Sequence, residues 1–285
     1  MNSLKVYWNQ WNIAERIIAI NVLLFLLGNL LPYLFQFSSN DLFYWFELSQ
    51  HGAEFLTKPW TLLTYGFFHV SLSHLFWNMI LLWAAAKMFL NLFNTQYFIN
   101  VYFLGTLVGG FLYLMSYQLF PVFVGQNSAL VGASAAVMAI LIFMCTYTPD
   151  QQVNVFFIRL KLWYLGVFLV FIDLVQIPSG NAGGHIAHLG GAYLGFLYAR
   201  KLKTGKDMGG WFASIWLYLA SLFKKSEKSP LKTVYRKKQY TKKTPNNKTE
   251  RQRKIDAILD KISRSGYESL SSDEKDFLFK AGKES

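Results

Sequence analysis

Residue types that could carry out acyl transfer lie inside long apolar stretches of the sequence. Ser134 lies in the run GASAA, and His188 lies in the run GHIAHLGG. Polar side chains within such stretches are costly and usually functional. A serine hydroxyl is a poor nucleophile until a base within hydrogen-bond reach removes its proton, which a histidine can do. A lone helical serine more often bonds to its own backbone, but the combination predicts Ser134 as nucleophile and His188 as base.

Two further polar residues could stabilise the charge that such an attack creates. An attacked carbonyl becomes an oxyanion and needs hydrogen-bond donors aimed at it. His74 and Asn78 are four residues apart, so they share one face of a helix. Asn78 alone would more often join two helices. With Ser134 and His188 present, we expect His74, Asn78 and the backbone N–H of Ser134 to be the oxyanion donors.

A glycine strip predicts how the serine and the base could meet. His188, Gly191 and Gly195 lie at positions i, i+3 and i+7, on one helix face. Small residues spaced in this way let a neighbouring helix approach closely. The serine segment offers a matching set of small residues, which are Gly132, Ala135, Ala136 and Ala139. If the two strips pack together, His188 is brought to Ser134.

Three other reactive residues need an interpretation. His185 shares a helix face with His188 but lacks glycines at the matching spacing, so we favour His188 as the base and expect His185 to be solvated near the outer rim. Asp173 lies near the outer end of an apolar stretch, so we expect it to reach the membrane interface and give it no catalytic role. Cys145, the only cysteine, is expected to be inert. Neither a metal nor a cofactor is expected.

The elements that hold these residues must be membrane-spanning helices. The chain of 285 residues is 53% hydrophobic and only 15% charged, and no acidic or basic residue occurs between Lys87 and Asp150. A span needs about 20 mostly apolar residues, and backbone groups in lipid must be satisfied within helices. We therefore predict an all-α polytopic membrane protein. Its six spans are placed at 17–37, 61–86, 98–119, 129–148, 160–177 and 185–203.

Loop charge predicts the orientation of these spans. One set of connections is basic, and the opposite set is mostly acidic or uncharged. Basic connections face the cytoplasm, so we expect a multi-pass protein of the cell (inner) membrane with both termini cytoplasmic. His74, Ser134 and His188 then all fall in the first half of spans that run from outside to inside. All three should lie at similar depth in the outer half of the bilayer.

The C-terminal part of the chain differs in composition from the spans. We divide the chain into a transmembrane domain (1–205), an interfacial amphipathic helix with a basic linker (206–250) and a helical hairpin (251–285). Residues 224–254 hold thirteen Lys or Arg and two acidic residues, so we expect contact with anionic lipid rather than nucleic acid. In the hairpin, Gly266 should stop the first helix, and Ser271 with Glu274 should form a capping box.

The motifs on three predicted spans resemble those of the rhomboid intramembrane serine proteases. The similar pattern is His74-x-x-x-Asn78, then Gly132-x-Ser134, then Ala187-His188-x-x-Gly191-x-x-x-Gly195. The resemblance covers residues from about 10 to 205 and implies a six-helix rhomboid fold. It also implies a Ser–His dyad without a third acid and cleavage of single-span transmembrane proteins near the outer membrane face. The C-terminal hairpin resembles an appendage of some bacterial rhomboids.

The resemblance also implies a role for each matched residue. Ser134 matches the nucleophile, His188 the base, and His74 and Asn78 the oxyanion positions. Gly132 matches the glycine before the serine, and His69 matches a histidine that often opens the motif of span two.

The sequence departs from the rhomboid pattern at two places. Ala135 stands where a glycine commonly follows the serine, and the outer loop lacks the Trp-Arg pair of many members. Two other functions stay open. One is a rhomboid-like protein that binds membrane helices without cutting them, although such proteins characteristically lose the serine or histidine that this chain retains. The other is a transporter, which is disfavoured because the polar residues stop at mid-depth.

Overall fold

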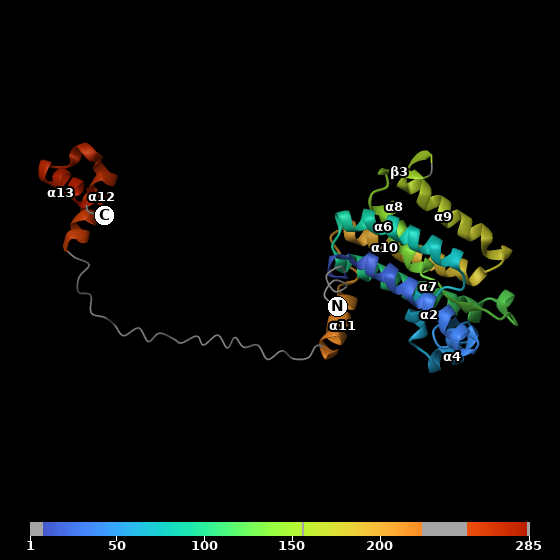
Figure 1. Ribbon diagram of the computed structural model, residues 1–285. Coiled ribbons are helices and arrows are strands. Elements are labelled where there is room, and N and C mark those ends of the chain that lie inside the picture. The colour runs from blue at the N-terminus through green and yellow to red at the C-terminus, as the bar shows by residue number, and fades with distance from the viewer. Residues whose placement is uncertain (1–7, 156, 224–249, 284–285) are drawn as a thin grey trace. The chain divides into compact units, whose positions relative to one another are not determined.

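The computed structural model describes residues 8–155, 157–223 and 250–283 (Figure 1). The chain divides into two compact units, Met1–Lys225 and Ser226–Ser285. The first unit contains every residue that the sequence predicts to be catalytic or to stabilise the oxyanion. The two units are therefore described separately.

Within the described residues, six helices of 14 to 25 residues form the bundle of the first unit, and α11 (Gly210–Phe223) follows them. The six are α2 (Ile13–Phe35), α6 (Leu72–Leu92), α7 (Thr95–Leu119), α8 (Ser134–Tyr147), α9 (Leu162–Gln176) and α10 (Ala182–Lys203). Within the described residues, α2, α6, α7 and α9 with its extension to Ser179 are long and apolar enough to cross a membrane. The helix α8 is equally apolar but has only 14 residues. The protein is thus a mostly helical multi-pass membrane protein, while the number of six spans stays a prediction.

The predicted start of the second span, at residue 61, is wrong. The helix α6 begins at Leu72, and not near residue 61, because the extended residue Ser71 caps it by accepting a hydrogen bond from the N–H of His74 at 3.2 Å. The preceding residues form the short helices α5 (Thr61–Thr64) and η1 (Tyr65–Phe67). His69 therefore precedes the helix and lies in the connection to it.

The helix α8 is the centre of the bundle. Its residues from Ala135 to Cys145 are all buried, and it contacts α6, α7, α9 and α10. The helix α9 is the opposite case, because only Leu162, Gly166 and Asp173 are buried on it. The core of the bundle therefore lies around α8, whereas most residues of α9 are not buried.

The expected packing of the two small-residue strips is present between α8 and α10. A β-carbon at Gly191 would overlap the carbonyl group of Ala135, and one at Gly195 would overlap that of Ala139. These glycines let the two backbones touch, which larger residues would prevent. The close approach holds His188 at the level of the first turn of α8.

Shorter elements connect the helices. The segment between α2 and α6, which the sequence predicts to face outward and which is here called the outer segment, holds α3 (Ser39–Phe43), β1 (Leu48–Ser49) and α4 (Gly52–Thr57). The strand β1 pairs antiparallel with β2 (Ala129–Leu130) just before α8. A second hairpin joins β3 (Gln152–Val155) to β4 (Ile158–Lys161). The remaining turns are η2 (Pro121–Phe123) and η3 (Ile177–Ser179). The pairing of β1 with β2 ties the outer segment to the entrance of α8.

The helix α11 (Gly210–Phe223) extends the first unit beyond α10. Phe212 is buried and packs near Phe103 of α7, with ring centroids 6.3 Å apart. Trp211, Ile215 and Tyr218 are exposed. This arrangement is compatible with the predicted interfacial helix. Most of the basic segment that follows lies outside the described residues.

The second unit consists of α12 (Glu250–Ser265), η4 (Tyr267–Ser269) and α13 (Ser272–Lys283). Gly266 follows α12 with φ +76°, a left-handed conformation that favours glycine. The predicted capping box is present, because Ser271 N–H donates to Glu274 and Glu274 N–H donates to the Ser271 hydroxyl. Lys261 also pairs with Glu274 at 2.8 Å and links the two helices.

Candidate active site

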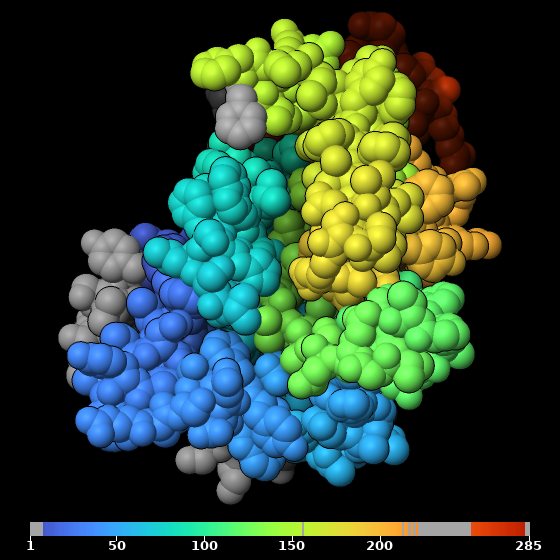
Figure 2. All heavy atoms as spheres, turned by 90° about the vertical axis from the view of Figure 1, so that its right-hand side faces the viewer, coloured from blue at the N-terminus to red at the C-terminus, as the bar shows by residue number. Residues whose placement is uncertain are grey.

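One groove gathers the predicted reactive side chains. It has a volume of about 580 Å³ and is lined by residues from α6, α8, α9 and α10. The lining includes Ser134, His188, His74 and Asn78, and also Asp173. Figure 2 shows the furrow between α6, in teal, and α9, in yellow, with α8 visible between them. The sequence separates these residues widely, and the fold brings them to one cavity.

A sharp turn delivers Ser134 to this groove. Ser134 is the first residue of α8, and Gly132 precedes it with φ +122°. A β-carbon at Gly132 would lie 2.6 Å from Cε1 and 2.8 Å from Nε2 of His74. Glycine is thus required here by both conformation and space. The same crowding places the His74 ring directly beside the turn that leads to the serine.

The position of Ser134 at a helix start has an electrostatic consequence. The first N–H groups of an α-helix have no partner within the helix, and they form the positive end of the helix dipole. A negative oxygen that develops beside Ser134 therefore meets unpaired donors. The N–H of Ser134 lies at this helix start, and its role as an oxyanion donor stays a prediction.

His69 supports the same turn from behind. The side chain of His69 is buried, and its Nε2 accepts a hydrogen bond from the backbone N–H of Ala133 at 3.4 Å. Its ring centroid lies 5.0 Å from that of His74. His69 does not line the groove, so its contacts assign it to holding the loop before Ser134.

Asn78 and His74 face the groove from α6. Asn78 Nδ2 donates to the backbone carbonyl of His74 at 2.9 Å, which uses one of its two amide hydrogens. The Asn78 side chain is buried, while His74 is half-buried. Both residues can therefore present donors to a group that enters the groove beside Ser134.

The structure corrects the predicted surroundings of the two α10 histidines. Nδ1 of His188 lies 2.9 Å from Asp173 Oδ1, and Nδ1 of His185 lies 2.8 Å from the same oxygen. The Asp173 side chain is only 8% exposed, so the prediction that it reaches the interface is wrong. The prediction that His185 is solvated at the rim is also wrong, because its side chain is 14% exposed against 24% for His188.

The sequence gives Asp173 no predicted role, whereas the structure places it against both histidines. A carboxylate inside an apolar helix is expensive unless it is paired, and this fact was the available signal. His188 lines the groove with Ser134, whereas His185 lies behind it. This difference favours His188 as the base.

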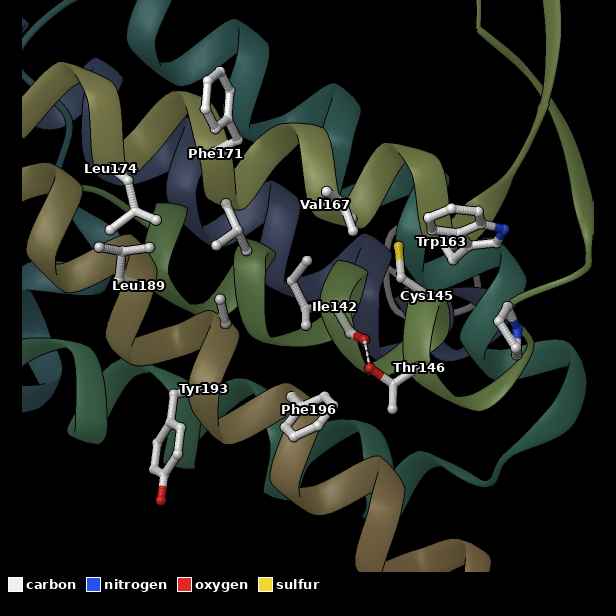
Figure 3. Close-up of a pocket in the computed structure, with 14 residues that line it drawn as sticks. Ile142, Cys145, Thr146, Trp163, Val167, Phe171, Leu174, Leu189, Tyr193 and Phe196 are labelled. Atoms are coloured by element: carbon white, nitrogen blue, oxygen red, sulfur yellow. Dashed lines mark hydrogen bonds between the residues drawn. The ribbon is translucent and has the colours of Figure 1, made fainter.

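A second cavity lies on the other side of α9, between α8, α9 and α10 (Figure 3). It has a volume of about 680 Å³, and apolar side chains such as Trp163, Phe171 and Phe196 line it. The Thr146 hydroxyl points back to the carbonyl of Ile142 at 2.7 Å. The described lining includes Cys145 but neither a histidine nor a carboxylate. Among the described lining residues, this cavity therefore offers no histidine–carboxylate pair of the kind found at the groove.

Comparisons with known proteins agree with this architecture. Residues 56–204 match the rhomboid domain, and residues 241–281 match a family of unknown function (DUF6576). The human "Presenilin-associated rhomboid-like protein, mitochondrial" is 29% identical over 200 residues, which cover 67% of this chain and 50% of that protein. The "RHOMBOID-like protein 12, mitochondrial" of Arabidopsis thaliana is 30% identical over 158 residues, covering 51% and 47%.

The chain thus spans about half the length of the curated relatives that it matches. The rhomboid match extends from α4 to the end of α10, and it contains every residue that lines the groove. This match covers more than half of the chain, and the chain belongs to the rhomboid family.

Proposed function

We propose that this protein is an intramembrane serine endopeptidase that cleaves transmembrane proteins near the outer face of the membrane. Ser134 is the nucleophile and His188 is the base. The observation that carries the proposal is the groove that Ser134, His188, His74 and Asn78 all line. These residue types serve the three needs of acyl transfer, which are a nucleophile, a base and oxyanion donors.

The proposed reaction has two stages. Ser134 Oγ attacks the carbonyl carbon of the scissile peptide bond while His188 Nε2 takes the hydroxyl proton. The oxyanion receives hydrogen bonds from His74, Asn78 and the N–H of Ser134. His188 then gives its proton to the departing amine as the C–N bond breaks. Water, deprotonated by His188, then attacks the acyl ester, and His188 returns its proton to Ser134 Oγ as the bond to the acyl carbon breaks, which restores the enzyme.

The shape of the groove supports a membrane-embedded substrate. The groove lies between α6 and α9 (Figure 2), and α9 is the helix with the least buried surface among the four groove helices. Trp77 lines it and is 54% exposed. A transmembrane segment could therefore approach Ser134 from the side, through lipid. We further propose an inner-membrane protein with cytoplasmic termini whose basic segment contacts anionic lipid.

The alternative is a rhomboid-like protein that binds membrane helices without cutting them. The two functions are separated by reconstituting the protein in liposomes with a single-span reporter substrate and identifying fragments by mass spectrometry. We expect cleavage by the wild type and none by Ser134→Ala. The control is Ser116→Ala, since Ser116 is also buried in a helix but its hydroxyl bonds to the carbonyl of Tyr113. If the wild type binds the reporter without cutting it, the non-catalytic function is correct.

A further inference from the structure

We infer that Asp173 is a positioning residue that makes the Ser134–His188 pair a triad, with the carboxylate of α9 orienting the base of α10. The inference rests on the proposed function and deepens it. It also departs from the dyad without a third acid that the family resemblance implies. The inference is based on the hydrogen bonds of one carboxylate oxygen, Asp173 Oδ1.

The hydrogen bonds of Asp173 fix the tautomer of His188. An ionised carboxylate can only accept hydrogen bonds, so at 2.9 Å the Nδ1 of His188 must be the donor. A neutral imidazole carries its proton on one nitrogen, which leaves Nε2 of His188 as the acceptor that a general base needs. When His188 takes the serine proton, the adjacent carboxylate stabilises the imidazolium. Asp173 keeps its charge throughout, and the proton passes only between Ser134, His188 and the leaving amine.

The surroundings offer Asp173 no other counter-charge. Within the described residues, its only ion-pair partners are His185 and His188. The sequence of α8 contains no acidic or basic residue, and Asp173 is the only one in α9. Across the groove, α6 contributes His74 and Asn78. A buried carboxylate is costly unless it is well paired, so the two histidines account for its presence.

His185 has a different role because it does not line the groove. It donates to the same oxygen of Asp173 at 2.8 Å and so holds the carboxylate against α10. These separations are those of hydrogen bonds, and the three side chains satisfy one another without an ion. His185 is therefore the matched control, because its removal disturbs the same contact between α9 and α10 without removing the charge beside the base.

Two variants test the inference by kinetics. In Asp173→Asn, which keeps the size of the side chain, we expect kcat for a single-span reporter to fall by about 100-fold or more with little change in KM. The acid limb of the pH–rate profile should move to lower pH, because a neutral amide no longer stabilises the imidazolium. His185→Ala removes a neighbour of the carboxylate but not the charge beside the base, so its loss in kcat should be at least about tenfold smaller than that of Asp173→Asn, and it should leave that limb in place. A structural role alone would affect both variants alike.

A readout that does not need cleavage keeps the inference separate from the proposed function. Nitrogen-15 NMR of histidine-labelled protein, assigned with single histidine variants, should show the Nδ1–H tautomer for His188 in the wild type. In Asp173→Asn the signal should shift toward Nε2–H. If wild-type protein shows no cleavage yet His188 has this Asp173-dependent tautomer, the proposed function fails and the positioning role stands. If Asp173→Asn changes neither the tautomer nor the pH–rate profile, the positioning role is wrong.

Discussion

Replacing Gly191 by valine should inactivate the protein about as completely as losing a catalytic group. A β-carbon at this position would lie 2.8 Å from the carbonyl carbon and 3.2 Å from Cα of Ala135, and the carbonyl oxygen is closer still. Ordinary contact for a β-carbon begins at 3.4 Å. The obstructing atoms belong to the backbone of α8, so a side-chain rotation cannot relieve the overlap.

The helices α8 and α10 must therefore separate, and this separation increases the distance between Ser134 and His188. The backbones of α8 and α10 have to move apart by about 1 Å, and a displacement of this size between reacting groups can cost about 100-fold in rate. Ser134 precedes Ala135 directly, and His188 lies one turn before Gly191. Overpacking itself costs about 1–3 kcal/mol of stability. Valine is well tolerated in lipid, so the variant should still insert into the membrane.

The assay is the cleavage rate of the reporter in liposomes, measured together with thermal unfolding. Gly190→Ala is the matched control, because its β-carbon would press on Gly109 of α7 at 2.9 Å and not on α8. We expect this control to be at least about tenfold more active than Gly191→Val, since it leaves the contact between α8 and α10 in place. A folded Gly191→Val protein with wild-type activity would refute the reasoning, as would equal losses in both variants.

Three further predictions address the oxyanion donors, the first unit and the hairpin. His74→Ala and Asn78→Ala should each lower kcat by about 100- to 1000-fold; unchanged rates in both would mean that the oxyanion is held elsewhere. A chain that ends at Lys225 should still cleave the reporter, because the groove lies wholly within the first unit; a folded but inactive truncation would show that the second unit is coupled to the chemistry. Lys261 and the helix cap hold the pKa of Glu274 below its ordinary value, so its stabilising effect is present above the unfolded pKa and is lost as the pH falls through the folded one. Hydrogen exchange of α13 should therefore be faster in Glu274→Gln than in the wild type at pH 7, with the difference shrinking as the pH falls through the lowered pKa of Glu274, whereas equal exchange at pH 7 would contradict this role.

Features that depend on the spacing of residues close together in the chain could be predicted from the sequence. The glycine strip places small residues at helical spacing, and the structure packs Gly191 and Gly195 against α8 as expected. The end of α12 before Gly266 and the capping box at the start of α13 depend on residues within a few positions of one another. Such patterns need no knowledge of distant contacts, because the helix period alone fixes which side chains meet.

Features that depend on distant segments could not be predicted in this way. The pairing of Leu48 with Leu130 joins the outer segment to the entrance of α8, and neither short strand has a recognisable pattern. The start of α6 could not be predicted, because the apolar composition continues upstream through the residues of α5 and η1. The burial of Asp173 could not be predicted, because its position near the end of α9 indicates the interface, whereas its partners lie on another helix.

The central claim is that His188 activates Ser134 for attack, and covalent labelling of the serine tests it most directly. A fluorophosphonate probe reacts with a serine whose proton is removed by a neighbouring base. Peptide mass spectrometry should find the probe on Ser134 of the wild type and of His185→Ala. It should find none on His188→Ala that has folded normally. Labelling of Ser134 that persists without His188, or that requires His185 in its place, would contradict the account.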